Sequence, residues 1–255
     1  MYFRPIRMGR AQKKRRNMNS KNKTSSSNMG YIFLSGAGLG SWVWKDVMAS
    51  LKQPSVGVNY PKDPNVGIEE YAQAAIDQIK DLSVEKMVVV SHSLGGVVGL
   101  KVAEALGERL AGFVAISAAI PKNGGSFFSS LPFPQKMIMP LIMKLAGTKP
   151  PEAALRKGYC NDLSVEQTAE VLKRYAAESA KIYSDSSTLP PSSVPKLYIK
   201  TTNDNEFSDT LQNIMQRNLG ADKIVTINSG HLPMLSKPEE LAGLLDDFVR
   251  DFRLR

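Results

Sequence analysis

The chain has 255 residues and a formal charge of +9, and its 42% hydrophobic and 22% charged residues are typical of a globular chain with one large core. Residues 1–30 hold nine of the 33 lysines and arginines and no acid, so the other residues carry 24 bases and 24 acids. This neutral balance argues against a nucleic-acid-binding face on the folded body. One cysteine and two histidines exclude a disulfide framework and a Cys/His zinc site.

Residues 1–30 are basic, rich in Ser and Asn and almost free of aliphatic residues. Such a composition does not repay the entropy of ordering, so we predict a disordered tail. A transit peptide, a nucleic-acid-binding arm and a true start at Met18 or Met29 are alternative interpretations. No run of 18 apolar residues and no secretory signal occurs. These absences predict a cytoplasmic protein without a membrane span, and they leave organelle targeting by the tail open.

From Tyr31 onward, short apolar runs alternate with amphipathic segments, which is the pattern of βαβ units around a mostly parallel sheet. The pattern predicts about six strands, at residues 31–35, 55–59, 86–91, 112–116, 196–200 and 223–227. Helices are predicted from about residue 41, over 68–82, 94–106 and 209–217, and at the C-terminus. The last helix is expected to begin with a capping box from Ser236 to Glu239.

About 75 residues separate the fourth predicted strand from the fifth, where one short helix normally suffices. The interval contains helical stretches, one of them opened by a capping box from Ser164 to Gln167. We therefore predict a tail at 1–30, a core formed by 31–120 and 195–255, and an inserted helical cap at 121–194.

The tract Val-Val-Val-Ser-His-Ser-Leu-Gly-Gly, residues 88–96, reads as a buried strand that ends in a serine before glycines and a helix. A strand-to-helix turn this sharp presents the hydroxyl of its central residue above the carboxyl edge of the sheet. We identify Ser93 as a nucleophile on this basis. The usual pattern is Gly-x-Ser-x-Gly, and Ser91 stands here in place of the first glycine.

A nucleophilic serine needs a base, and an imidazole that serves as the base needs an acceptor for its other N–H. His231 follows the last predicted strand and is expected at the same sheet edge as the serine, whereas His92 is expected to point away and to be structural. Asp204 follows the strand at 196–200 and is the preferred acceptor. The alternatives are Glu206 and Asp209, further from the strand end, and Asp162 in the predicted cap.

The tetrahedral intermediate of acyl transfer requires two backbone donors. We predict the N–H groups of Leu94, after the nucleophile, and of Ala37, in the glycine-rich loop after the first strand. Glycines 36, 38 and 40 also suggest a dinucleotide fold, but the Gly-x-Gly-x-x-Gly spacing is missing and no acid ends the next strand. No cofactor and no metal are therefore expected.

With these residues in place, the chain resembles the α/β-hydrolase superfamily over about residues 30–253, and within it the branch of small methyl esterases and hydroxynitrile lyases. Residues 35–44, Ser-Gly-Ala-Gly-Leu-Gly-Ser-Trp-Val-Trp, are similar to the branch's His-Gly-Ala-x-x-Gly-x-Trp-x-Trp segment, and residues 230–241 are similar to its histidine segment. The resemblance implies an α/β-hydrolase fold with a triad of Ser93, Asp204 and His231. It also implies Ala37 and Leu94 as oxyanion donors.

The resemblance also bears on the reaction. The lyases of this branch carry a lysine after the catalytic histidine and a threonine in the first loop, where this chain has Leu232 and Gly36, so hydrolysis is favoured over cyanohydrin cleavage. The expected activity is hydrolysis of a small-molecule carboxylic ester through an acyl-enzyme. An acyltransferase and a ligand-binding receptor with slow hydrolysis are the alternatives, and a homodimer stays open.

The predicted cap is rich in apolar side chains, which either line an acyl or aromatic pocket or pack the cap on the core. These side chains are Phe127, Phe128, Leu131, Phe133, Met137, Met139, Leu141, Ile142 and Met143. We predict substrate contacts for Phe128, Phe133 and Met137 of this set, and for Ser35 and Gly36 beside the oxyanion loop.

Overall fold

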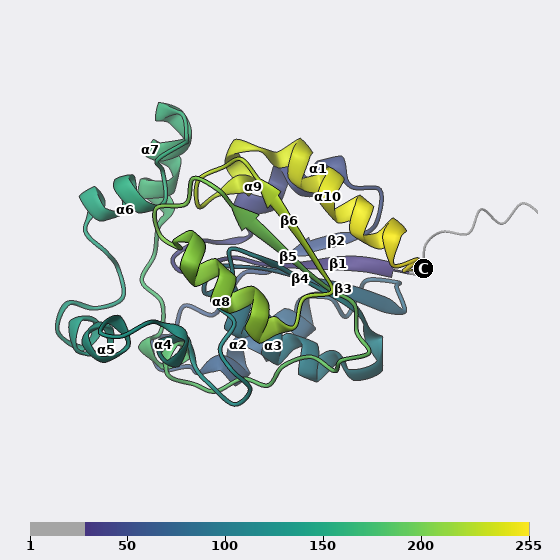
Figure 1. Ribbon diagram of the computed structural model, residues 1–255, viewed down its shortest axis with the longest axis horizontal. Helices are drawn as coiled ribbons and strands as arrows, with labels where there is room; N and C mark the ends of the chain where they lie inside the picture. Colours follow the sequence, from purple (N-terminus) through teal and green to yellow (C-terminus); the bar gives the residue numbers. More distant parts are fainter. Residues whose placement is uncertain (1–28, 255) are drawn as a thin grey trace, which may run out of the picture.

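The computed structural model describes residues 29–254, which form one six-stranded parallel sheet between two layers of helices (Figure 1). The strands lie in the order β2-β1-β3-β4-β5-β6. Their bounds are β1 (Met29–Leu34), β2 (Ser55–Gly57), β3 (Lys86–His92), β4 (Leu110–Ile116), β5 (Lys196–Thr201) and β6 (Lys223–Ile227). The prediction of an α/β fold with about six strands is confirmed.

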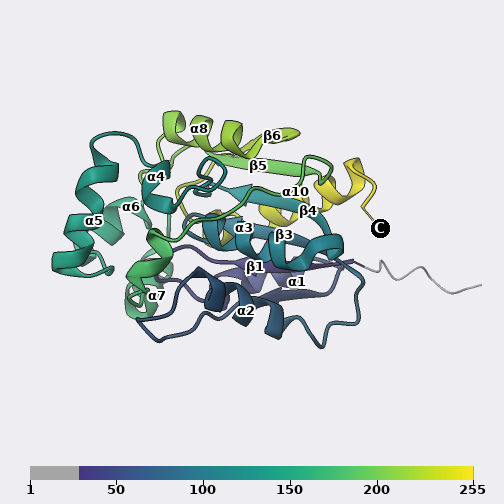
Figure 2. The ribbon, with the colours of Figure 1, turned by 90° about the horizontal axis from the view of Figure 1, so that it is seen from below.

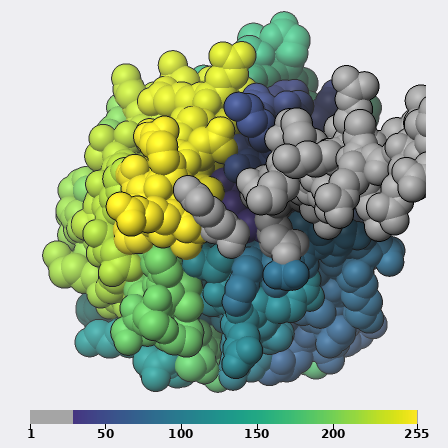
Figure 3. All heavy atoms as spheres, turned by 90° about the vertical axis from the view of Figure 1, so that its right-hand side faces the viewer, coloured from purple at the N-terminus to yellow at the C-terminus, as the bar shows by residue number. Residues whose placement is uncertain are grey.

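Helices cover both faces of the sheet. One face carries α2 (Ile68–Gln78), α3 (Gly95–Leu106) and α8 (Asp209–Leu219), and the other carries α1 (Lys45–Ser50), α9 (Pro233–Ser236) and α10 (Pro238–Asp251). Short 3₁₀ turns lie at η1 (Ser41–Trp44), η2 (Gly107–Arg109) and η3 (Ala180–Tyr183). Figure 3 looks at the end of the sheet where α10 lies against α1.

The central strand β3 shows why its sequence is apolar at successive positions. Val88 and Val90 pack with the core on the α1 and α10 face, whereas Met87 and Val89 pack with the core on the α2, α3 and α8 face. A strand buried on both faces needs apolar side chains of both parities. The run of β-branched residues therefore places β3 in the middle of the sheet, where its carboxyl end can carry the site.

The first strand begins two residues earlier than predicted. Met29 and Gly30 pair with Lys86 and Met87 of β3, and a Cβ on Gly30 would lie 2.8 Å from the carbonyl oxygen of Pro54. The prediction of a tail over residues 1–30 is therefore wrong for Met29 and Gly30, because the composition of the segment does not reveal their pairing with β3. The rest of the predicted tail, residues 1–28, lies outside the described residues.

Four helices occupy the interval between β4 and β5: α4 (Phe127–Ser130), α5 (Gln135–Ala146), α6 (Glu152–Gly158) and α7 (Val165–Arg174). They gather at the carboxyl end of the sheet, on the left in Figures 1 and 2. Among residues 29–254, no helix is both long and apolar enough to cross a membrane. The structure thus places helices of the interval 121–194 over the edge where the candidate site was expected.

The two predicted capping boxes have different outcomes. At α7, the Ser164 hydroxyl accepts a bond from the backbone N–H of Gln167 at 3.1 Å, and the Gln167 side chain accepts one from the Ser164 N–H at 3.0 Å. At the C-terminus the prediction is wrong, since Ser236 is the last residue of α9 and its hydroxyl bonds with that of Ser229 at 2.9 Å. Helix α10 begins at Pro238 without a side-chain cap.

Candidate active site

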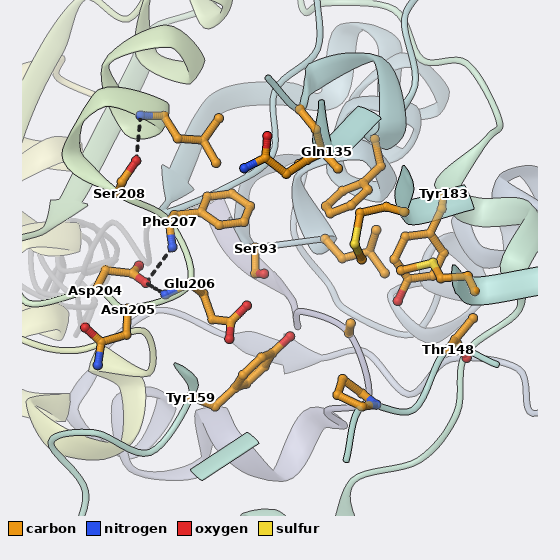
Figure 4. A pocket seen from close by; sticks show the side chains of 18 of the residues that line it. Ser93, Gln135, Thr148, Tyr159, Tyr183, Asp204, Asn205, Glu206, Phe207 and Ser208 are labelled. Atoms are coloured by element: carbon orange, nitrogen blue, oxygen red, sulfur yellow. Dashed lines mark hydrogen bonds between the residues drawn. The ribbon is translucent and has the colours of Figure 1, made fainter. Parts of the chain in front are cut away.

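Ser93 lies in a sharp turn between β3, which ends at His92, and α3, which begins at Gly95. Its φ is 52°, in the left-handed region that a non-glycine residue rarely adopts. The turn also requires small neighbours, because a Cβ on Gly95 would lie 2.6 Å from the carbonyl oxygen of Leu34, and one on Gly96 2.4 Å from that of Ala119. The strained turn directs the Ser93 hydroxyl into a pocket (Figure 4).

Ser91 replaces the usual first glycine of the turn, and the structure shows what accommodates it. Its side chain points at α3, where a Cβ on Gly99 would lie 1.9 Å from the Ser91 Oγ. The hydroxyl is buried and has no hydrogen-bond partner among the described residues. The departure from the motif is therefore tolerated because Gly99 leaves space, but a buried polar atom is left unpaired.

We expect Ser91→Ala to raise the free energy of unfolding by about 1 kcal/mol, because an unpaired buried hydroxyl costs its desolvation free energy. Urea unfolding of the two proteins measures this change. Ser35→Ala is the matched control, since the buried Ser35 hydroxyl accepts a bond from Trp44 Nε1 at 2.9 Å and donates one to the Gly40 carbonyl at 3.0 Å. That variant should lose about 1 kcal/mol. Equal destabilisation by both changes would show that the Ser91 hydroxyl is satisfied.

The predicted base and acid lie in hydrogen-bond order with Ser93. The Ser93 hydroxyl lies 3.0 Å from His231 Nε2, and His231 Nδ1 lies 2.8 Å from Asp204 Oδ2. The His231 and Asp204 side chains are 0% and 1% exposed. Loops after three different strands, β3, β5 and β6, supply the three residues, so the parallel sheet brings them together at one edge.

The carboxylate of Asp204 is held by further donors. The Thr201 hydroxyl donates to Oδ2 at 2.7 Å, and the backbone N–H groups of Glu206 and Phe207 each donate to Oδ1 at 2.8 Å. Burial raises the pKa of Asp204, but the charge of His231 and these bonds outweigh burial and hold the pKa well below its ordinary value. Asp204 is therefore ionised at neutral pH.

His231 responds in the opposite direction. Burial lowers its pKa, but the charge of Asp204 and the bond to its carboxylate outweigh burial, so the pKa lies above the ordinary 6.5. With Asp204 accepting from Nδ1–H, the neutral imidazole presents Nε2 as an acceptor to the Ser93 hydroxyl. The arrangement can remove a proton from Ser93 and stabilise the imidazolium that results.

His92 has a structural contact that the sequence did not reveal. Its Nε2 lies 2.7 Å from the carbonyl oxygen of His231, to which it donates. Burial and the neighbouring His231 lower the pKa of His92 to about 3, so its ring is neutral. His92 thus holds the backbone of His231 in place, and the hydrogen-bond partner of Ser93 Oγ is His231.

The alternative acids have other contacts. Asp209 pairs with Lys200 on the surface, and Asp162 accepts from the backbone N–H of Gly230 at 2.6 Å. Glu206 lies on the pocket wall, and burial raises its pKa, as does the charge of Asp204. Among these carboxylates, the hydrogen bond to the imidazole is made by Asp204.

The backbone N–H groups of the two predicted oxyanion donors lie at the pocket. Ala37 and Leu94 line the pocket beside Ser93, and no hydrogen bond from either N–H to another group is found within residues 29–254. A Cβ on Gly36 would lie 2.7 Å from Ser93 Cβ, so glycine is needed for the loop to approach the turn. Gly38 anchors this loop to the helical interval, since its N–H donates to Glu178 Oε1 at 3.1 Å.

A cavity of about 580 Å³ opens above Ser93 (Figure 4). Most of its wall is aromatic or aliphatic, as in typical small-molecule sites. The aromatic lining is Phe127, Tyr159, Tyr175, Tyr183 and Phe207, and the aliphatic lining includes Leu131, Met139, Met143 and Leu211. The wall thus combines residues of the interval 121–194 with residues that follow β5.

The predicted substrate contacts are not on this wall. Ser35 binds Trp44 and Gly40, and Gly36 packs on the turn. Phe128 stacks on Tyr183 at 5.8 Å between ring centroids. Phe133 and Met137 are 76% and 67% exposed and do not line the cavity. Apolar composition pointed to this interval, but the orientation of each side chain decided which of them line the cavity.

Several lining residues were not predicted as substrate contacts. Glu206 and Phe207 lie two and three residues after Asp204, and their position beyond the carboxyl end of β5 was a signal that could have found them. Tyr159 and Tyr175 come from the ends of α6 and α7, and their rings meet edge to face at 5.7 Å. No spacing in the sequence indicated that these two tyrosines would flank the site.

Residues 31–244 match the model of the Alpha/beta hydrolase family. The chain belongs to this family. Putative methylesterase 11, chloroplastic, from Arabidopsis thaliana is 25% identical over 248 residues, which cover 86% of this chain and 64% of that protein. Methyl jasmonate esterase 1 from Vitis vinifera is 24% identical over 262 residues, which cover 87% of this chain and 97% of that protein.

Solved structures show the same fold. An extracellular α/β-hydrolase from a Paenibacillus species superposes with a TM-score of 0.76 at 19% identity, over 86% of this chain and 98% of that one. The methylesterase MES16 from Arabidopsis superposes with a TM-score of 0.71 at 20% identity, over 88% and 99%. The predicted fold and the membership of the α/β-hydrolase family are confirmed. Relatives that match along most of the chain are named as methylesterases, which supports the predicted branch and the expected class of enzyme, a carboxylic ester hydrolase.

Proposed function

We propose that the protein is a serine esterase in which Ser93 is the nucleophile, His231 the general base and Asp204 the residue that orients the imidazole. The observation that carries this proposal is the hydrogen-bonded series from Ser93 through His231 to Asp204 at the floor of an apolar cavity. An isolated hydroxyl is a poor nucleophile, and a base within 3.0 Å supplies the activation that it needs.

The proposed reaction has two halves. His231 Nε2 takes the proton of Ser93 as the oxygen attacks the ester carbonyl, and the N–H groups of Ala37 and Leu94 bind the oxyanion. The imidazolium returns the proton to the leaving alcohol, and an acyl-enzyme remains. Water, activated by the same His231, then releases the acid and restores Ser93.

We assign the substrate class from the cavity wall. Residues 121–194 act as a cap over a core formed by the remaining described residues, and Met139, Met143 and Tyr183 from the cap give the cavity an apolar interior. Such a wall suits a small or medium ester with an apolar acyl or aromatic part. The relatives named as methylesterases support a methyl ester of such an acid.

The experiment that tests this function is detection of the acyl-enzyme. Brief exposure of the purified protein to p-nitrophenyl acetate at low pH should add one acetyl group to the peptide that contains Ser93, as measured by mass spectrometry. Addition of methanol during turnover distinguishes hydrolase from acyltransferase, since a hydrolase gives mainly acetate. A mainly methyl acetate product would assign the site to acyl transfer, and a protein without adduct or turnover would be a receptor.

Glu206 is expected to set a charge preference in the substrate. The wall of this cavity, as lined by the described residues, has no lysine or arginine, and its two acids are Asp204, paired with His231, and Glu206. An acyl chain that ends in a carboxylate would therefore meet a negative site. We expect p-nitrophenyl hydrogen glutarate to have a kcat/KM at least about tenfold below that of the neutral p-nitrophenyl butyrate.

Glu206→Gln should recover most of that difference while it leaves the neutral ester within about twofold, because the amide keeps the shape and removes the charge. The ratio of kcat/KM for the two esters is the measurement, so that a general loss of activity cancels. If the variant changes both esters by the same factor, Glu206 does not act on substrate charge.

A further inference from the structure

Helix α5 exposes an unusual amount of apolar surface. It lies at the outer tip of the helices that cover the carboxyl end of the sheet, and none of its residues is buried (Figures 1 and 2). Six of the eight large hydrophobic side chains that are exposed within residues 29–254 belong to α5 or to the turn before it. These six, which we call the α5 face, are Phe133, Met137, Ile138, Leu141, Ile142 and Leu145.

The helix has two distinct sides. Met137, Leu141 and Leu145 follow one another at four-residue spacing, and Ile138 and Ile142 form the adjacent row, so the exposed residues of the helix share one side. Gln135, Met139 and Met143, also four apart, lie on the other side and line the cavity. One side of α5 therefore lines the cavity, and each residue of the α5 face is between 46% and 79% exposed.

The segment of the chain that carries the α5 face has charges of one sign. Residues 121–151 contain four lysines, Lys122, Lys136, Lys144 and Lys149, and no acid. All four lysines are exposed. The described part of the chain outside this segment carries bases and acids throughout, so the basic character is local.

We propose that the α5 face docks on an anionic lipid surface. A helix with an apolar side and lysines around it inserts the apolar side chains at the boundary between headgroups and acyl chains. The lysines are attracted by the negative potential of acidic lipids. The apolar area and the positive charge occur on the same short segment, and this combination matches such a surface.

A second copy of the chain fits the α5 face less well. Lys144 borders the α5 face, seven residues after Met137, so two α5 helices packed about a twofold axis would place Lys144 of both copies at the contact, and the segment has no acid to pair with them. An acidic lipid surface neutralises the same lysines.

Docking would also set the cavity beside the lipid, because Met139 and Met143 belong to the same helix. This docking does not depend on the proposed chemistry.

Flotation with vesicles tests the proposal on the full chain. Vesicles of phosphatidylcholine with 30% phosphatidylserine should bind the protein at least about tenfold more tightly than vesicles of phosphatidylcholine alone. The pair Leu141→Glu with Leu145→Glu should reduce binding by about tenfold or more, because it places charge on the inserted side. The pair Lys136→Gln with Lys144→Gln should reduce it by about fivefold per lysine.

Val165→Glu is the matched control, since Val165 is 82% exposed but lies on α7, and it should bind as the parent does. Residues 1–28 are present in every variant, so a loss in the Leu141 and Leu145 pair is assigned to α5. Ser93→Ala should bind equally, which separates docking from the esterase function. Unchanged binding of the leucine pair would overturn the proposal, as would a dimer in solution that this pair converts to a monomer.

Discussion

Ser93→Ala is expected to reduce hydrolysis of short p-nitrophenyl esters by about 10⁴-fold or more. The substitution removes the oxygen that attacks the carbonyl. The hydroxyl of Ser91, two residues earlier in the chain, cannot replace it, because Ser91 is buried against α3. The measurement is the steady-state release of p-nitrophenol by the two purified proteins at equal concentration.

The control for this result is the stability of the variant, because residue 93 has a φ of 52°, a backbone conformation that alanine also rarely adopts. The variant and the parent should unfold within about 1 kcal/mol of one another in urea, since the change removes one side-chain oxygen. If a stably folded Ser93→Ala protein kept more than about a tenth of the parent rate, another nucleophile would be at work.

Asp204→Asn is expected to lower kcat/KM by about 10³ to 10⁴-fold. The asparagine amide would donate toward His231 Nδ1, which favours the tautomer with the proton on Nε2, and that nitrogen could then no longer accept the proton of Ser93. Loss of the carboxylate also removes the charge that stabilises the imidazolium during the reaction.

The pH profile gives a second readout of Asp204. A general base must be neutral, so the rate of the parent protein rises as the pH increases through the pKa of His231. Because that pKa is raised, the rising part of the pH profile, its acid limb, is centred above pH 6.5. Without the Asp204 charge, burial is the main remaining influence and lowers the pKa of His231. The residual activity of Asp204→Asn should therefore have its limb at lower pH.

Asp209→Asn provides the matched control for the acid. Asp209 lies five residues after Asp204, at the start of α8, but its carboxylate is 75% exposed and pairs with Lys200 on the surface. Exposed ion pairs contribute little to stability, so this variant should keep the rate of the parent within about twofold and should have its acid limb at the same pH as the parent. A large effect of Asp209→Asn, or an unshifted limb in Asp204→Asn, would contradict the assignment of the acid.

The sequence alone predicted the parts of the site that depend on the order of strands and turns. Ser93, Asp204 and His231 each follow a strand with a recognisable apolar pattern, and parallel strands of one sheet end at the same edge. Local composition also identified the glycines of the turn and of the first loop. These predictions needed only neighbours along the chain and one general property of parallel sheets.

The tertiary structure alone decided which side chains surround that edge. Phe133 and Met137 have the same composition signal as Met139 and Met143, yet the first two are exposed and the last two line the cavity. The rotation of a short helix is set by its contacts with the rest of the molecule, and no pattern within its own few turns specifies those contacts.

The same reason explains the remaining differences between expectation and structure. His92 reaches the backbone of His231 across 139 positions of sequence, and Gly99 makes room for Ser91 from a neighbouring helix. Sequence patterns report on residues one strand or one helical turn apart. The chain by itself therefore determined the fold, the order of the candidate triad and the class of chemistry, whereas long-range packing decided the shape, charge and lining of the cavity.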